Sequence, residues 1–419
     1  MRYCLSALFL LLLSASPLLA EEAEERDYRA EAIEILESVP LIDGHNDVPW
    51  QYRQRVDNRI ARINIAVDTS EMEPPMHTDI PRLRQGRVGG QFWSIYVSPD
   101  MPGAEATKAQ LEQIDVARRM IARNEDLQFV TTADEVEEAF ADSRIASLLG
   151  IEGGHVLDNS IATLRTFYAL GARYMTLTHW QNNDWADSAT DDPRHGGLTD
   201  FGRAIVGEMN RIGMLVDLSH VAPSTMHDTL DVTHSPVIFS HSSAMGVTPH
   251  PRNVPDDVLD RLPENGGIVM VTFVPSFVNE QVRQHGAERQ AQQARLASLH
   301  IGDPGARERA MGEWDAANPA PRATLNDVAD HIDYIRDRVG ADYIGIGGDF
   351  DGITTVPDGL EDVSTYPALF AELLRRGYER EELEKIAGLN LLRVMRANEA
   401  YKASVSERRP TDVRIEDFQ

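Results

Sequence analysis

Cysteine is almost absent from this chain of 419 residues, since Cys4 is the only one. Residues 1–20 have the pattern of a secretory signal peptide, with a positive charge at Arg2, an apolar core at 8–13 and the small residue Ala20 at the end. A chain without this segment contains no cysteine, which excludes disulfides, thiolate metal ligands and a cysteine nucleophile. Any metal ion must then be bound by His, Asp and Glu.

Basic residues and long apolar runs are also scarce. The chain has 40 Lys and Arg against 67 Asp and Glu, a net charge of −27, which argues against nucleic acid or an anionic membrane as partner. The apolar run at 8–13 is well short of the roughly 20 residues that span a bilayer, although a membrane anchor is the alternative interpretation. The polar C-terminus lacks the apolar tail of a lipid-anchor signal. We expect an exported protein, periplasmic or extracellular, without a membrane anchor in the mature chain.

Short apolar segments alternate with amphipathic helices along the rest of the chain. Eight segments are predicted as strands: 39–47, 91–97, 145–151, 172–177, 214–218, 236–240, 267–273 and 343–347. Helices are predicted at 21–39, 107–124, 161–170, 199–212, after Pro223, and at 325–339, 366–376 and 381–397. This alternation is typical of an α/β fold with a parallel sheet, and eight units indicate a (β/α)8 TIM barrel. An open doubly wound sheet is the alternative, but no glycine-rich dinucleotide motif follows the first strand.

The predicted organisation is a signal peptide at 1–20, a catalytic barrel at 21–400 and a polar tail at 401–419. The stretch after Asp47, with prolines at 74, 75 and 81, is predicted as a long loop. A polar helical insertion at about 279–322 lies between the seventh strand and its helix. We interpret this insertion as a solvated excursion, with a lid or a dimer contact as alternatives.

Polar residues with metal-binding side chains follow the predicted strands. The C-terminal ends of barrel strands meet at one mouth, where active sites lie. Seven candidates stand there: His45, Asp47, Glu152, His179, His220, His241 and Asp349. Imidazole and carboxylate ligands suit Zn²⁺, and also Mn²⁺, Co²⁺ or Fe²⁺. The set is large enough for two ions, and the carboxylate of Glu152 is the natural bridge between them.

A family resemblance rests on eight motifs in order. They are DGHNDVP at 43–49, GIEGGH at 150–155, RYMTLTH at 173–179, WAD at 185–187, DLSH at 217–220, FSHSS at 239–243, RNVPDDVL at 252–259 and GIGGDFDG at 345–352. From about residue 38 to 400 the chain resembles the membrane (renal-type) dipeptidase family of zinc hydrolases, and within it the exported bacterial-type members. The resemblance implies an amidohydrolase-type (β/α)8 barrel, in agreement with the strand count.

The resemblance also implies two Zn²⁺ ions per chain. His45 and Asp47 would bind the first ion, His220 and His241 would bind the second, and Glu152 would bridge them. A water or hydroxide shared by the two ions would be the nucleophile.

The remaining roles follow from the same resemblance. Asp349 would be the general acid/base, His179 would stabilise the oxyanion, and Arg252 would bind the terminal carboxylate of the substrate. Asp351 is the main competitor of Asp349. Further candidates for supporting roles are His155, with a plain loop role as the alternative, and two carboxylates that would orient ligand imidazoles, Asp43 and Asp217.

The predicted function is hydrolysis of dipeptides, including those with a C-terminal D-residue, by a protein that the family suggests is a homodimer. Two alternatives stay open. One is another metal-dependent amidohydrolase acting on N-acyl amino acids or cyclic amides, and the other is a non-catalytic binding protein with the same fold. Arg252 discriminates between dipeptide hydrolysis and the alternative amidohydrolase activity, because only substrates with a terminal carboxylate need its guanidinium.

Overall fold

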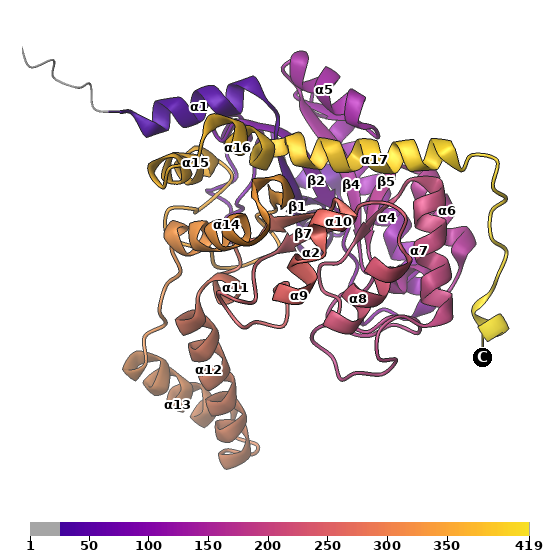
Figure 1. The fold of residues 1–419 in the computed structure, drawn as a ribbon. Helices are drawn as coiled ribbons and strands as arrows, with labels where there is room; N and C mark the ends of the chain where they lie inside the picture. Colours follow the sequence, from indigo (N-terminus) through magenta and orange to yellow (C-terminus); the bar gives the residue numbers. More distant parts are fainter. Residues whose placement is uncertain (1–25, 419) are drawn as a thin grey trace, which may run out of the picture.

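A computed structural model describes residues 26–418, so the predicted signal peptide lies outside the described residues. Among the described helices, none combines the length and apolar character needed to cross a bilayer. Figure 1 shows strands enclosed by helices, with one pair of helices extending away from the rest.

Nine parallel strands form the sheet. They are β1 (Leu41–Asn46), β2 (Val88–Ser94), β3 (Leu127–Phe129), β4 (Ile145–Glu152), β5 (Ala172–Thr176), β6 (Leu215–Asp217), β7 (Ile238–Ser242), β8 (Ile268–Val271) and β9 (Ile344–Ile346). The order is β2-β1-β9-β8-β7-β6-β5-β4-β3, and the additional pairing of β2 with β4 closes eight strands into a barrel. The predicted eight-stranded parallel barrel is therefore confirmed. β3, which we did not predict, pairs only with the first residues of β4.

Helices surround the barrel. The longer ones are α1 (Tyr28–Ser38), α2 (Val48–Val56), α3 (Ile80–Gln85), α4 (Gly103–Ala122), α5 (Ala133–Ala141), α6 (Ile161–Ala169), α7 (Asp200–Ile212), α8 (Pro223–Val232), α12 (Glu280–Leu299), α13 (Pro304–Ala317), α14 (Leu325–Val339), α15 (Tyr366–Arg375), α16 (Arg380–Glu384) and α17 (Asn390–Ser404). Three single-turn helices follow β7 and β8: α9 (Asp256–Leu259), α10 (Leu262–Asn265) and α11 (Pro275–Val278). α17 lies over the N-terminal ends of the strands, since Asn398 and Arg393 bind the carbonyls of Pro236 and Gly266, just before β7 and β8. The opposite end is left open as the mouth.

The strands are buried on both faces, as expected for a parallel sheet covered by helices. One cluster of buried side chains fills the space inside the strands and beneath α17, and includes Phe92, Tyr174 and Met270. A larger cluster lies between the strands and the outer helices. The packed interior leaves space for a ligand only at the C-terminal ends of the strands.

Several element boundaries were predicted wrongly. The stretch after Asp47 is not one loop, because it forms α2 and α3, each with a proline in its first turn. β2 begins three residues earlier than predicted, and α17 continues past the predicted end into the tail, as far as Ser404. β7 extends past its predicted end to include His241, and β1 includes His45 as predicted, so both side chains stand on strands rather than on loops.

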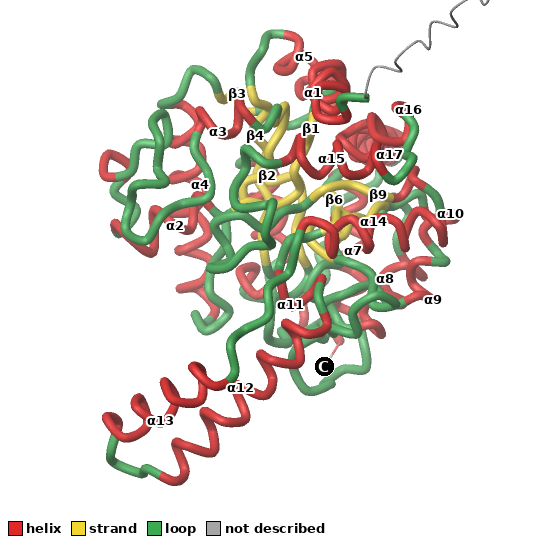
Figure 2. The backbone as a smooth tube through the Cα atoms, turned by 90° about the vertical axis from the view of Figure 1, so that its left-hand side faces the viewer, coloured by secondary structure: helices red, strands yellow, loops and turns green. Residues whose placement is uncertain are grey.

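Residues 279–322 form a hairpin of two helices, α12 and α13. It begins next to α11, which lines the mouth, and extends away from the barrel (Figures 1 and 2). Within the two helices only Leu296 is buried, whereas Leu299 is 62% exposed and Ile301, in the turn between them, is 86% exposed. The hairpin therefore adds little to the core.

Candidate metal centre and active site

The seven candidates predicted at strand ends lie together at the mouth of the barrel. They come from the ends of β1, β4, β5, β6, β7 and β9. With neighbouring residues they line a cavity of about 480 Å³. The residues of this cavity that the sequence singled out are Asp47, Glu152, His179, His220, His241, Arg252 and Asp349. His45 lies directly beneath, fully buried.

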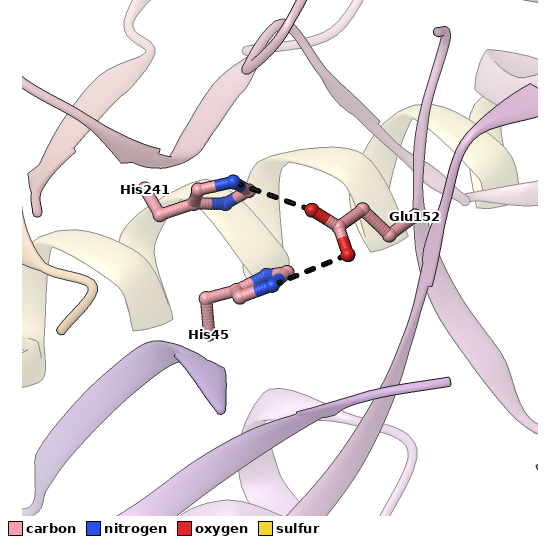
Figure 3. Close-up of side chains that lie close together, drawn as sticks. All are labelled: His45, Glu152 and His241. Atoms are coloured by element: carbon pink, nitrogen blue, oxygen red, sulfur yellow. Dashed lines mark ion pairs between the residues drawn. The ribbon is translucent and has the colours of Figure 1, made fainter. Parts of the chain in front are cut away.

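The carboxylate of Glu152 lies at the centre of this cluster. Its Oε2 is 3.5 Å from Nε2 of His45, and its Oε1 is 3.4 Å from Nε2 of His241 (Figure 3). The same Oε1 is 3.0 Å from Nε2 of His220 and 3.4 Å from Nε2 of His179. Two groups with metal-ligand spacing therefore share Glu152: one with His45 and His241, the other with His179 and His220. This arrangement is consistent with two bridged metal ions.

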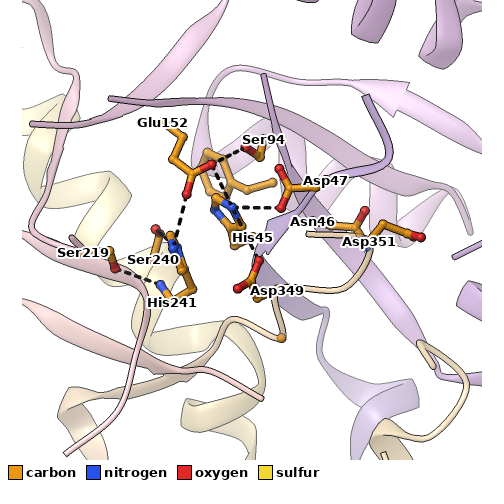
Figure 4. A network of polar contacts seen from close by, with 12 residues as sticks. His45, Asn46, Asp47, Ser94, Glu152, Ser219, Ser240, His241, Asp349 and Asp351 are labelled. Carbon is orange, nitrogen blue, oxygen red and sulfur yellow. Dashed lines mark hydrogen bonds and ion pairs between the residues drawn. The ribbon is translucent and has the colours of Figure 1, made fainter. Parts of the chain in front are cut away.

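A third group joins His45 to two further carboxylates. Nε2 of His45 is 3.2 Å from Oδ2 of Asp47 and 4.0 Å from Oδ1 of Asp349 (Figure 4). The partition implied by the family resemblance pairs His220 with His241. The two Nε2 atoms of that pair are 2.9 Å apart, but the geometric groups place His241 with His45 as well.

From the family resemblance, His179 was predicted to stabilise the oxyanion and to bind the substrate, and not to be one of the metal ligands. Its Nε2 is as close to Glu152 as that of His241, so the structure adds it to the candidate ligands.

Hydrogen bonds assign the tautomer of His45. The hydroxyl of Tyr174 donates to the carbonyl of Gly44 (3.3 Å), so it accepts from Nδ1–H of His45 (2.9 Å). Nε2 of His45 is then an unprotonated nitrogen facing two carboxylates, those of Asp47 and Glu152. A lone pair turned toward buried anions is satisfied by a positive charge, which either a proton on Nε2 or a bound metal ion supplies.

A similar series of hydrogen bonds assigns the tautomer of His241. Ser240 donates its hydroxyl proton to Asp217 (2.6 Å) and accepts from Nδ1–H of His241 (2.9 Å). Nε2 of His241 is therefore also bare, and it faces both Nε2 of His220 and Oε1 of Glu152. The convergence of these Nε2 atoms on the carboxylate of Glu152 is the donor set that one or more divalent cations prefer.

Burial and neighbouring charges shift the pKa values of the cluster. Burial lowers the pKa of His220 and of His241 well below the usual value, so both imidazoles are neutral and able to bind a metal. Burial opposes a charge on His45, but the neighbouring Tyr174, Glu152 and Asp47 raise its pKa well above the usual value. The site therefore favours a positive charge at His45, which a proton or a metal ion supplies.

The two remaining carboxylates are shifted in opposite directions. Burial opposes ionisation of Glu152, yet the imidazoles around it, led by His45 and His179, lower its pKa well below the usual value. Burial and the charges of Asp47 and Glu152 raise the pKa of Asp349 well above its usual value, against the opposing effect of His45. A raised pKa suits a carboxylate that accepts and returns a proton.

Three of these residues have a strained backbone. His220, Asp349 and Asp351 have φ values of 69°, 63° and 64°, in the left-handed region that non-glycine residues rarely adopt. Such strain costs about 1–3 kcal/mol per residue and is retained where the surrounding structure holds a functional side chain in position.

Asp351, the competitor of Asp349, is oriented differently. Its Oδ1 accepts from the backbone N–H of His77 (2.9 Å), and its own N–H donates to Nδ1 of that residue (3.1 Å). Asp351 therefore holds the loop before α3 at the mouth through hydrogen bonds, whereas Asp349 lines the cavity.

Arg252 is buried at the wall of the cavity. Its Nη atoms donate to the hydroxyl of Ser242 (3.4 Å) and the carbonyl of His241 (3.3 Å), and Nε has no partner among the described residues. Burial lowers its pKa to about 10, so the guanidinium keeps its charge at neutral pH. A buried cation held only by neutral acceptors is suited to bind an anionic group of a ligand.

The two carboxylates predicted to orient ligand imidazoles differ, because Asp217 does so through one intervening hydroxyl and Asp43 does not. Asp43 accepts from the backbone N–H groups of His45 (2.7 Å) and Gly348 (2.9 Å) and from the hydroxyl of Tyr366, so it orients the main chain and not an imidazole. Asp217 reaches His241 through Ser240.

His155 lies beside Gly153 and is excluded from the geometric ligand groups. Sequence reasoning missed Tyr174, Ser240 and Ser94, whose hydroxyl binds Glu152 (3.2 Å). The alternation along β5 was the available signal for Tyr174, because it lies two residues before Thr176 on the inward face.

Comparison with known proteins identifies the family. The sequence matches the family described as membrane dipeptidase (peptidase family M19) over residues 29–409. The chain belongs to this family. A curated relative, dipeptidase verJ of Clonostachys rogersoniana, is 41% identical and the alignment covers 93% of this chain and 92% of the relative. The chain is thus a metallo-dipeptidase, and the predicted family is confirmed. Because this relative is fungal, the bacterial-type branch stays a prediction.

Solved structures show the same fold. The probable dipeptidase PvdM from Pseudomonas aeruginosa matches with a TM-score of 0.74 at 22% identity, over 89% of this chain and 99% of that chain. A metallo peptidase from Rhodobacter sphaeroides, liganded with a phosphinate mimic of L-Ala-D-Ala, matches with a TM-score of 0.70 at 25% identity, over 86% of this chain and 99% of that chain.

Proposed function

We propose that this metallo-dipeptidase hydrolyses dipeptides with a free C-terminal carboxylate, including those with a D-residue at that end. The observation that carries the proposal is the buried guanidinium of Arg252 at the wall of the metal-ligand cavity, because it offers a carboxylate two charge-assisted hydrogen bonds. The mimic of L-Ala-D-Ala bound to the Rhodobacter sphaeroides relative supports the tolerance for a D-residue.

In the proposed mechanism the protein groups bind, orient and move protons. Arg252 binds the terminal carboxylate and thereby directs the scissile carbonyl toward Glu152 and its imidazoles. Two Zn²⁺ ions, when bound, supply a water activated at neutral pH and polarise the carbonyl. In this mechanism His179 acts as a hydrogen-bond donor and not as a metal ligand, and it donates to the oxygen on which negative charge develops. Asp349 accepts the proton of the attacking water on its carboxylate and returns a proton to the leaving amine.

The main test is a panel of L,L- and L,D-dipeptides assayed with the metal-loaded protein. We expect turnover of both classes, loss of activity with a chelator and recovery on addition of Zn²⁺. Recovery with Mn²⁺ or Co²⁺ but not with Zn²⁺ would contradict the choice of metal. Absence of turnover on the whole panel, with two ions bound per chain, would contradict the function.

A second candidate function is hydrolysis of N-acyl amino acids or cyclic amides by the same centre. Arg252→Ala distinguishes the two. We expect this variant to lose at least about a hundredfold in kcat/KM on dipeptides, since a charged hydrogen-bond pair is removed from a buried site, and to retain activity on a cyclic amide. Arg252→Lys is the matched control, because it keeps the charge but not the planar fork, and we expect an intermediate loss.

Export, periplasmic or extracellular location and a homodimer belong to the same proposal. The expected cleavage near residue 20 is tested by N-terminal sequencing of the protein recovered from the medium or periplasm. The homodimer is tested by light scattering on the metal-loaded protein, where a mass of one chain would contradict it.

A further inference from the structure

Three aromatic side chains form a continuous wall on one side of the cavity. The rings of Trp50 and Tyr96 are 4.7 Å apart and nearly perpendicular, and those of Tyr96 and Trp180 are 6.0 Å apart. Trp180 is 44% exposed at the mouth, while Tyr96 behind it is buried. An exposed indole on a cavity wall has apolar surface that a ligand can cover.

The topology separates this wall from Arg252. Around the barrel the strands follow the order β1-β2-β4-β5-β6-β7-β8-β9. Trp50, Tyr96 and Trp180 follow β1, β2 and β5, whereas Arg252 and the neighbouring Phe277 follow β7 and β8. The aromatic wall and the guanidinium therefore stand on opposite arcs of the mouth.

The cluster around Glu152 draws its side chains from both arcs. His45, Glu152 and His179 come from β1, β4 and β5, whereas His220, His241 and Asp349 come from β6, β7 and β9, so they converge between the wall and Arg252. A dipeptide whose carboxylate is bound by Arg252 places its peptide bond over the cluster and its N-terminal residue on the far side. We propose that the wall of Trp50, Tyr96 and Trp180 binds the N-terminal side chain and makes the enzyme selective for large apolar or aromatic residues there. This inference rests on the proposed function, because it takes Arg252 as the carboxylate anchor.

A cationic N-terminal side chain fits this wall less well. Apart from the carboxylates of the metal-ligand cluster, the acidic residue that lines the cavity is Asp100, whose Oδ1 already accepts from Gln181 (2.7 Å) and whose Oδ2 accepts from Ser98 (3.3 Å). Both oxygens are engaged and the carboxylate is exposed to water, so it attracts a cation weakly. Apolar contact with the indole is the stronger interaction that the wall offers.

The test compares Phe-Ala, Lys-Ala and Ala-Ala with the wild type and with Trp180→Ala and Trp180→Phe. We expect the wild type to prefer Phe-Ala over Ala-Ala by at least about tenfold in kcat/KM, and Trp180→Ala to reduce this ratio by about tenfold. Trp180→Phe keeps an aromatic surface and should hold the ratio within about threefold. Trp314→Ala, which removes an indole from α13 outside the cavity, should leave the ratio unchanged.

A binding measurement accompanies the kinetics. Phosphinate analogues of Phe-Ala and Ala-Ala, titrated by calorimetry, should show the same loss of discrimination in Trp180→Ala without depending on turnover. Melting temperatures establish that each variant is folded.

Three results would overturn the inference while leaving the proposed function intact. They are a wild-type ratio near one, a preference for Lys-Ala over Phe-Ala, and equal losses on all substrates in Trp180→Ala. Equal losses would mean that Trp180 acts only by supporting His179, whose ring is 4.1 Å away. If the wild type cleaves none of the three dipeptides, the proposed function itself fails.

Discussion

Tyr174→Phe removes a single hydroxyl from the inside of the barrel and leaves the ring in place. The ring is 4.9 Å from that of Phe92, and it lies against Gly150, where a Cβ would be 2.0 Å from the phenol carbon. The hydroxyl accepts from Nδ1–H of His45 and donates to the carbonyl of Gly44. The variant therefore tests the polar chain behind His45 without a large change in packing.

Two effects of known size follow. Loss of the group that orients a ligand imidazole weakens metal binding by about 10- to 100-fold, or about 1.4–2.7 kcal/mol. The buried Nδ1–H of His45 is also left without a partner, which costs about 1–3 kcal/mol of folding free energy. We expect both losses, and we expect the weakened ion to be the one that His45 contacts.

The assay is titration of the metal-free protein with Zn²⁺ against a competing chelator, with unfolding by denaturant measured in parallel. Tyr378→Phe is the matched control, because its buried hydroxyl donates to Asp333 (2.8 Å) outside the mouth. The control should lose stability but bind both ions normally. If Tyr174→Phe also binds both ions within twofold of the wild type, the assignment of the His45 tautomer is wrong.

Four further outcomes are expected. Glu152→Gln should reduce the metal content to at most one ion per chain by elemental analysis, because both ligand groups share this carboxylate; two tightly bound ions would contradict the bridge. Asp349→Asn should retain two ions and lose about 10²–10⁴ in kcat, and a smaller loss would assign the proton transfer elsewhere. Burial lowers the pKa of His331 to about 4, against 6.5 in the unfolded chain, so on acidification the unfolded chain binds the proton first. The free energy of unfolding should therefore fall by up to about 3 kcal/mol as the pH drops from 6.5 to 4. His331→Gln should flatten this part of the pH–stability curve measured by denaturant unfolding. Gly347→Ala should destabilise the barrel and weaken metal binding, because its Cβ would be 1.9 Å from the carbonyl of Ser240, next to a ligand; a normal melting temperature would contradict this.

The fold class followed from the sequence because its evidence is local. Short apolar strands, helix-forming segments and their alternation are visible along the chain, and eight repeats leave few topologies besides a closed barrel. The predicted boundaries of helices and strands were wrong where the local sequence signals were ambiguous. The prolines at 74, 75 and 81 were taken as loop markers, whereas Pro81 lies in the first turn of α3, and Pro49 lies in the first turn of α2. β3 is three residues long and carries too little pattern to be seen.

The sequence by itself determined the family, the barrel and the residue types available to bind metal, since the absence of cysteine outside the first residues leaves His, Asp and Glu. Only the tertiary structure decided how these residues are grouped. It added His179 to the ligand candidates, turned Asp351 toward His77, and placed Tyr174 and Ser240 behind the ligand imidazoles. The physical reason is that the grouping of the ligands and the tautomers of the ligand histidines depend on distances between strand ends. These strand ends are separated by many residues in the chain, and closure of the barrel sets the distances between them.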